Sequence, residues 1–212
     1  MKIKNYLSEN SKMKKSSGKR TYNFGIPAFK SATGFKTCPL AGECAKGCYA
    51  TMGTYTWSNV SQAFEARLEL SRSTLFVNVI SSELKRRKVE KLRIHDSGDF
   101  YNKKYLEKWI EIMILNPKIE FYAYTKMVKL FKDYKDKLPF NFTVIFSYGG
   151  LQDELIDVNN DRHSQVFKDN TELNNLGYID ASQDDNLALT ENTKVGLIYH
   201  GYKKNEWSTN GK

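Results

Sequence analysis

The chain is short of cysteine and of long apolar runs. Only 3 of its 212 residues are cysteine, and all three lie between positions 38 and 48. An odd number of clustered cysteines argues against a disulfide framework and favours a metal centre or reactive thiols. No apolar run reaches about 18 residues, so no transmembrane helix and no membrane partner are expected. The N-terminus lacks the apolar core of a signal peptide, which predicts a cytoplasmic protein.

Signature motifs of several common enzyme classes are also absent. The chain contains no G-x-G-x-x-G and no G-x-x-x-x-G-K-[ST], so neither a dinucleotide fingerprint nor a P-loop is visible. No G-x-S-x-G supports a serine hydrolase. No Pro-, Gly- or Ser-rich linker and no internal repeat interrupts residues 21–212, so this stretch is predicted to be a single domain.

Positive charge is what the chain has in excess. It carries 33 Lys and Arg against 24 Asp and Glu, which gives a formal net charge of +9 at pH 7. Such a balance suits an anionic partner, nucleic acid included. Residues 1–20 hold seven of these cations, one Glu and no apolar stripe. We therefore expect a basic, flexible and solvated tail over 1–20, with a nucleic-acid-contacting arm as the alternative.

The middle of the chain alternates helical and strand patterns. Apolar residues at helical spacing predict helices over 58–68, 75–84, 102–116 and 127–138, the third with Trp109, Met113 and Ile114 on its buried stripe. Strands are expected at LRIHDSG (92–98), IEFYAYT (119–125) and FTVIFSYGG (142–150), with shorter ones at SQVFK, YIDAS and VGLIYHG. This alternation predicts a parallel sheet. The predicted fold is α/β, a compact or partial (β/α) TIM-like barrel with parallel strands, and an open doubly wound sheet is the alternative.

Segments rich in polar residues follow these strands, at the end where ligands gather in both architectures. They are His95, Asp96, Ser97, Gly98 and Asp99, then Lys126, Ser147, Tyr148, Asp180, Ser182 and His200. The run from His95 to Asp99 is expected to bind a cofactor.

Individual roles are predicted for some of these residues and their neighbours. Lys126 and His200 are the candidate catalytic residues: Lys126 as a cation for a carboxylate or phosphate, and His200 as a general acid or base, or else a surface histidine. If Leu92, Ile94 and Asp96 face the helices, alternation along the strand puts Arg93 and His95 on the barrel side. Asp184-Asp185 is interpreted as a solvated loop.

The cysteine segment TCPLAGECAKGCYA places Cys38, Cys44 and Cys48 on one short loop, spaced Cys-x5-Cys-x3-Cys. Three thiolates suit an iron–sulfur cluster, each binding one iron. A [4Fe-4S] cluster would leave one iron open to a ligand, whereas a [3Fe-4S] cluster would be complete. The alternatives are a zinc ion, which would need His95, His163, His200 or a carboxylate as its fourth ligand, and unmetallated cysteines.

Four segments carry a resemblance to a known family. CPLAGECAKGCYA, RIHDSGDFYNKKYLEKW, EFYAYTK and VGLIYHG, in this order, resemble the "gene product 88" proteins of phages and other mobile elements, over roughly residues 22 to 202. Longer members of that family carry further cysteines near the C-terminus. This chain has none after Cys48, so a second metal site is not implied.

At one remove, the layout is similar to radical S-adenosylmethionine enzymes, in which a three-cysteine loop after the first strand holds a [4Fe-4S] cluster. The resemblance implies that Cys38, Cys44 and Cys48 bind the cluster, and that Ser97, Asp99 and Lys126 hold polar groups of S-adenosylmethionine. The chain departs from that pattern in its spacing, because the usual form is Cys-x3-Cys-x2-Cys. It also has Gly47, and not an aromatic residue, before the last cysteine.

The sequence therefore predicts an iron–sulfur protein in a host-cell cytoplasm, with its cluster at the C-terminal mouth of the strands. Whether it is an enzyme is open, and radical S-adenosylmethionine-type redox chemistry on a small-molecule ligand is the first class to test. The rival hypothesis is a nucleic-acid-binding accessory protein with a structural or redox-sensing cluster. Its tail and basic surface would contact phosphates.

Overall fold

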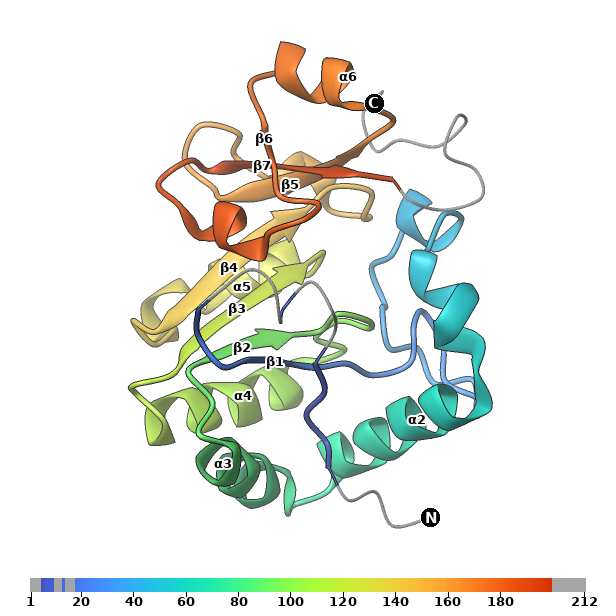
Figure 1. The fold of residues 1–212 in the computed structure, drawn as a ribbon, viewed down its shortest axis with the longest axis vertical. Coiled ribbons are helices and arrows are strands. Elements are labelled where there is room, and N and C mark those ends of the chain that lie inside the picture. The colour runs from blue at the N-terminus through green and yellow to red at the C-terminus, as the bar shows by residue number, and fades with distance from the viewer. Residues whose placement is uncertain (1–4, 10–12, 14–17, 200–212) are drawn as a thin grey trace.

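Seven strands form one curled sheet around which the rest of the chain is arranged (Figure 1). The computed structural model describes residues 5–9, 13 and 18–199. The strand order is β1-β2-β3-β4-β5-β7-β6, and every neighbouring pair is parallel. The strands are β1 (Thr21–Phe24), β2 (Lys91–Ile94), β3 (Glu120–Thr125), β4 (Phe142–Ser147), β5 (His163–Phe167), β6 (Ile179–Asp180) and β7 (Lys194–Ile198).

The strand order decides between the two predicted architectures. β1 to β5 follow one another in chain order, so successive crossovers continue in one direction, as they do in a (β/α) barrel. A doubly wound sheet instead reverses direction at a switch point. Within the described residues, β1 and β6 stand at the two edges, and the sheet is open. The prediction of a partial parallel α/β barrel is confirmed, whereas a TIM-like closed barrel is not.

The predicted helices are present with small changes at their ends. They are α2 (Ser58–Arg72), α3 (Phe76–Arg87), α4 (Lys103–Leu115) and α5 (Val128–Asp133), and a further short helix, α6 (Asn170–Asn175), follows β5. Short 3-10 helices are η1 (Glu43–Ala45), η2 (Tyr49–Thr51), η3 (Gly53–Thr56), η4 (Lys135–Lys137), η5 (Asp153–Leu155) and η6 (Asp185–Leu189). α5 is shorter than predicted because its last turn is the separate 3-10 helix η4. None of the described helices combines the length and the apolar character that crossing a membrane requires.

α4 illustrates how the sequence sets a helix and the face it buries. The side-chain oxygen of Asn102 accepts a hydrogen bond from the backbone N–H of Tyr105 at 2.9 Å, which caps the first turn. The helix buries Tyr105, Leu106, Trp109, Ile112 and Met113. The prediction that Ile114 belongs to this stripe is wrong, since that side chain is 62% exposed. Ile112 takes its place because it lies three residues from Trp109, on the same face.

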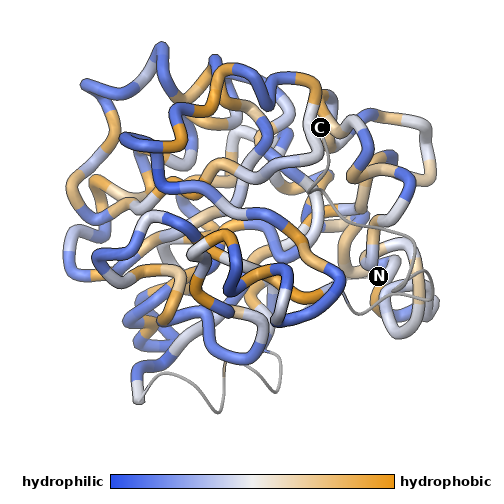
Figure 2. The backbone as a smooth tube through the Cα atoms, turned by 90° about the horizontal axis from the view of Figure 1, so that it is seen from above, coloured by the Kyte–Doolittle hydropathy of each residue, from blue (hydrophilic) through white to orange (hydrophobic). Residues whose placement is uncertain are grey.

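Buried side chains fill both faces of the sheet. The larger cluster lies between strands and helices, where Phe24, Phe76 and Trp109 meet edge to face at centroid distances of 5.2 to 5.6 Å. A smaller cluster contains Tyr122 and Ile145 of the sheet and Ala188 of η6. Figure 2 shows hydrophilic residues along many of the outer turns, as expected where the chain meets water. The C-terminal segment with η6 thus closes over part of the sheet.

The described part of the N-terminal segment is packed, which corrects the expectation of a solvated tail. Leu7 is 2% exposed and belongs to the larger core cluster. The backbone N–H groups of Tyr6 and Leu7 donate to the buried carboxylate of Glu83 on α3, at 2.8 and 3.1 Å. Ser8 forms an antiparallel bridge with Asn23 of β1. The net charge of the segment did not reveal these contacts, because a few scattered apolar residues leave no periodic signal.

Candidate functional site

A cavity of about 360 Å³ opens at the C-terminal ends of the strands. Its walls include Cys38, Cys44, Cys48, Tyr49, Tyr55, Arg93, the run from His95 to Asp99, Tyr124, Lys126, Ser147, Tyr148, Ser182, Leu197 and Tyr199. Nine of the ten residues predicted to be catalytic, cofactor-binding or metal-binding therefore border one space, whereas Asp180 of the strand-end residues is not among its lining. The tenth, His200, lies outside the described residues. As predicted, parallel strands bring their polar ends together at one edge of the sheet.

The cysteine loop is tied to these strand ends through its backbone. The N–H groups of Gly42 and Cys44 both donate to the carbonyl of Gly149, at 3.2 and 3.0 Å. A Cβ atom on Gly42 would stand 3.2 Å from the carbonyl carbon of Gly150, so the two backbones approach closely. On the other side, the N–H of Asp99 donates to the carbonyl of Thr37 at 3.1 Å. The loop thus spans from the end of β2 to the end of β4.

The three thiols lie close enough to influence one another. Burial raises the pKa of the Cys38 thiol to about 12, with smaller contributions in the same direction from Asp99, Cys44 and Cys48. Burial, and then Cys44, raises the pKa of Cys48, while the ammonium of Lys126 lowers it. With nothing bound, Cys38 is therefore a neutral thiol at physiological pH.

The arrangement bears on which metal group the cysteines could hold. Across the described residues, no three His, Cys, Asp or Glu side chains are grouped as ligands of a single ion. A cluster needs a different arrangement, because each cysteine binds its own iron. Of the histidines considered for zinc, His163 uses both ring nitrogens, with the carbonyl of Asp161 at 2.8 Å and the hydroxyl of Tyr178 at 3.0 Å.

His95 does not point where strand alternation placed it. Its φ of +64° ends the extended conformation directly after β2. The ring packs edge-on against Phe100 at 4.6 Å, and Nε2 pairs with the hydroxyl of Tyr105 on α4 at 3.0 Å. Burial lowers the pKa of His95 to about 3, so the imidazole is neutral. The prediction that His95 shares the barrel side with Arg93 is wrong.

The rest of this segment packs against the chain that continues β1. The carbonyl of Ser97 accepts from the N–H of Ile26 at 3.0 Å. Gly98 has a φ of +84°, and a Cβ there would stand 2.2 Å from Cγ1 of Ile26, so only glycine fits. Asp96 faces the cysteine loop, since Tyr49 donates to its carbonyl and Tyr55 donates to its carboxylate at 3.5 Å.

Asp99 and Lys126 hold the strand ends together. One carboxylate oxygen of Asp99 accepts from Thr125 Oγ1 and from the N–H of Phe100, both at 2.7 Å, and the other accepts from the N–H of Lys126 at 2.9 Å. Burial raises the pKa of Asp99 in spite of these bonds. Lys126 Nζ donates to the hydroxyl and carbonyl of Ser147 and to the carbonyl of Tyr148. Both residues border the cavity and also have structural contacts, and their predicted ligand roles stay predictions.

No pattern in the sequence predicts a protein partner for Arg93, a charged residue of β2. Arg93 pairs with Asp185 of η6 at 3.1 Å, and its guanidinium lies 4.9 Å from the ring centre of Tyr124. The hydroxyl of Tyr122 donates to the same carboxylate at 2.8 Å. Asp185 is only 5% exposed, so the interpretation of Asp184-Asp185 as a solvated loop is wrong for Asp185. Alternation along β2 and β3 puts Arg93, Tyr122 and Tyr124 on one face, but nothing local identifies Asp185 as their partner.

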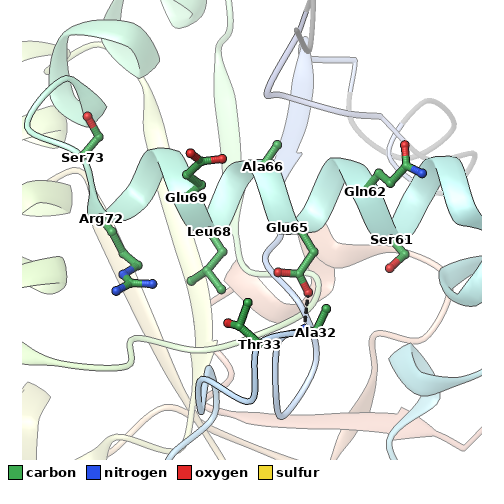
Figure 3. A pocket seen from close by; sticks show the side chains of 10 residues that line it. All are labelled: Ala32, Thr33, Ser61, Gln62, Glu65, Ala66, Leu68, Glu69, Arg72 and Ser73. Atoms are coloured by element: carbon green, nitrogen blue, oxygen red, sulfur yellow. Dashed lines mark hydrogen bonds between the residues drawn. The ribbon is translucent and has the colours of Figure 1, made fainter. Parts of the chain in front are cut away.

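A second hollow, of about 890 Å³, runs along α2 and contains none of the predicted site residues. Figure 3 shows Glu65, Leu68 and Arg72 of α2 pointing toward the loop that carries Ala32 and Thr33. The carboxylate of Glu65 accepts from the N–H of Ala32 at 2.6 Å, which fastens this loop to the helix. The hollow is open, and its lining offers no cluster of chemically reactive groups comparable to the cavity.

Comparison with known proteins identifies the family. The family model described as "Gene product 88" matches residues 2–211. The chain belongs to the gene product 88 family. It is also 33% identical over 116 residues to the "Gene 88 protein" of Mycobacterium phage L5, an alignment that covers 50% of this chain and 47% of the relative. The chain thus covers about half the length of this curated relative. No solved structure matches the chain.

This result confirms the predicted resemblance to the gene product 88 family, with a phage protein among its relatives. In this member of the family, the segments that carried the resemblance border one cavity: the cysteine loop, the run from His95 to Asp99, and the strand ends at Lys126 and Tyr199. The likeness to radical S-adenosylmethionine enzymes stays a prediction.

Proposed function

We propose that this gene product 88 protein holds an iron–sulfur cluster, [4Fe-4S] or [3Fe-4S], on Cys38, Cys44 and Cys48. The observation that carries the proposal is the shared position of the three thiols. All three border one cavity, on a loop that is hydrogen-bonded to the ends of β2 and β4. A loop anchored at both sides keeps its sulfur atoms in place, which lowers the entropy lost on binding.

The donor set suits such a cluster chemically. Thiolates are the usual protein ligands of iron–sulfur clusters. The thiol of Cys38 is neutral when nothing is bound, so cluster binding must release its proton. The positively charged irons would stabilise the thiolate that forms. A bound cluster would supply a one-electron redox couple, and a cubane with three cysteine ligands would also supply an open coordination position.

The cavity beside the cysteines supports a small-molecule ligand. Its volume of about 360 Å³ falls in the range typical of ligand sites, about 300 to 1,000 Å³. Apolar residues such as Val166 and Leu197 share its wall with the charged groups of Arg93 and Lys126. S-adenosylmethionine is the first ligand to test, with Ser97, Asp99 and Lys126 as the residues proposed to hold its polar groups.

The cluster proposal is tested by anaerobic purification followed by counts of iron and sulfide and an electron paramagnetic resonance spectrum. We expect brown protein that loses iron and visible absorbance when Cys38, Cys44 or Cys48 is changed to Ala. Thr37→Val is a matched control in the same loop, because it removes a buried hydroxyl that has no partner among the described residues and keeps the side-chain shape. Colourless protein with stoichiometric zinc, or full iron content in all three cysteine variants, would contradict the proposal.

The net charge of +9 favours a second candidate, a nucleic-acid-binding accessory protein with a structural or redox-sensing cluster. Binding through phosphates must weaken steeply as salt is raised, because it releases counterions. Duplex and single-stranded DNA are therefore titrated at rising salt, alongside S-adenosylmethionine. Strongly salt-dependent DNA binding without any effect of S-adenosylmethionine on the cluster spectrum would favour this candidate over the small-molecule one.

A further inference from the structure

The wall of the cavity includes two neighbouring residues with hydrogen-bond donors. Arg93 of β2 and Tyr124 of β3 both line the cavity, and the guanidinium of Arg93 lies 4.9 Å from the ring centre of Tyr124. The Nε of Arg93 and the hydroxyl of Tyr124 are fully screened from solvent, and neither has a hydrogen-bond partner in the described part of the chain. A buried donor without an acceptor is unfavourable, so a pair of them in one cavity wall calls for an explanation.

The surrounding charges favour a negative group at this point. Asp185 is the carboxylate that pairs with Arg93, at 3.1 Å, and it also accepts from Tyr122. Arg162 is a second cation close enough to act on Tyr124, and it donates to three backbone carbonyls, those of Ala188, Thr190 and Asn192. Two guanidinium groups and one carboxylate leave an excess of positive charge beside the Tyr124 hydroxyl.

Both donors keep their protons at physiological pH. Burial raises the pKa of Tyr124, with Asp185 acting in the same direction, so the hydroxyl remains a donor. Burial alone would lower the pKa of Arg93, but Asp185 and the neighbouring tyrosines raise it well above its usual value. A planar guanidinium and a neighbouring hydroxyl together offer several donors to the oxygen atoms of one anionic group.

We propose that the part of the cavity beside Arg93 and Tyr124 is an oxyanion subsite, in which these two residues hold a carboxylate or phosphate group of a small-molecule ligand. The subsite rests on the cavity of the proposed function and names its ligand class, but it does not depend on the cysteines holding a cluster. A ligand seated there would extend from the concave face of the sheet toward the cysteine loop, since one cavity joins the two.

The two tyrosines of β3 provide a matched pair of variants. Tyr124→Phe removes only the unpartnered hydroxyl and keeps the ring beneath Arg93, so the free protein should be as stable as wild type or more stable. Tyr122→Phe removes a donor to the buried carboxylate of Asp185 and should destabilise the free protein. If ligand binding falls in Tyr124→Phe alone, the loss cannot be attributed to a weakened fold.

The test uses urea unfolding of the full chain in inorganic phosphate and, separately, in acetate, with chloride at equal ionic strength as the reference. We expect phosphate, acetate or both to raise the unfolding midpoint of wild type as concentration increases. The apparent affinity should fall by about tenfold or more in Tyr124→Phe and should be kept in Tyr122→Phe. The arm that responds distinguishes a phosphate-bearing ligand from a carboxylate-bearing one.

Two outcomes overturn the subsite: neither anion exceeds chloride, or an anion stabilises Tyr124→Phe as much as wild type. In the second case the effect is general to the protein surface, and the Arg93–Asp185 contact is a structural ion pair. Iron and sulfide are counted in the same preparations. Protein that holds a cluster but shows no Tyr124-dependent anion effect refutes the subsite alone, and colourless protein that shows the effect refutes the cluster alone.

Discussion

Replacing Asp99 tests whether this residue anchors the site or only borders it. The carboxylate accepts three hydrogen bonds from buried donors: the backbone N–H groups of Phe100 and Lys126 and the hydroxyl of Thr125. Asp99 is itself 5% exposed, so water cannot replace these bonds. The donors come from the segment after β2 and from the end of β3, which Asp99 therefore joins.

The expected loss of unfolding free energy follows from the number of donors that each Asp99 variant leaves without an acceptor. In Asp99→Asn, the amide oxygen can replace one carboxylate oxygen, but the amide nitrogen must then face the N–H of Lys126. One buried donor is lost, at a cost of about 2 kcal/mol of unfolding free energy. In Asp99→Ala all three donors lose their acceptor, and we expect a loss of about 3–5 kcal/mol.

The assay is equilibrium urea unfolding, followed by the fluorescence of the chain's tryptophans, among them the buried Trp109, and by circular dichroism. Amide hydrogen exchange should in addition become faster at Phe100 and Lys126 in both variants. Asp133→Asn is the matched control, because its ion pair with Lys129 is exposed and should contribute less than about 0.5 kcal/mol. If Asp99→Asn unfolds within about 0.5 kcal/mol of wild type and its amides stay protected, the anchoring role is refuted and a pure ligand role is favoured.

Two further predictions concern parts of the fold away from the cysteines. Leu7→Ala should cost about 2–4 kcal/mol in urea unfolding, because Leu7 is buried in the main core. Ile114→Ala, at a 62% exposed position, should cost less than about 0.5 kcal/mol, and equal costs would show that the N-terminal segment does not pack. His95 stays neutral to about pH 3 when folded, whereas an unfolded histidine binds a proton near pH 6.5. Wild type should therefore lose about 2 kcal/mol more than His95→Asn between pH 7 and pH 5, and parallel curves for the two proteins would contradict the burial of a neutral imidazole.

The order of strands and helices could be read from the sequence because it depends on local periodicity. The alternation of short apolar strands with helical stripes such as the one in α4 predicted a parallel sheet, and parallel strands necessarily bring their C-terminal ends to one edge. For the same reason, the strand-end residues from His95 to Asp99 and Lys126 could be assigned to one site. The closeness of Cys38, Cys44 and Cys48 followed from their spacing in the chain.

Which partner each of these side chains contacts was decided only by the tertiary structure. A positive φ at His95 turned its ring away from the face that alternation assigned, and no periodic pattern reports one residue's backbone angle. The carboxylates of Asp185 and Glu83 meet Arg93 and Leu7, which lie 92 and 76 residues away in the chain. Asp99 likewise bonds to residues distant in the chain, since its carboxylate accepts from Thr125 and Lys126.

Such pairings depend on how strands and helices pack across the whole sheet, because a buried charge is stable only where distant segments supply its counter-charge or donors. The sequence by itself determined the elements, their order and the gathering of thiols and polar groups at one edge. The tertiary structure decided which of those groups are hydrogen-bonded within the fold. It also decided which of them, like Arg93 Nε and the Tyr124 hydroxyl, are buried in the cavity wall with no partner among the described residues.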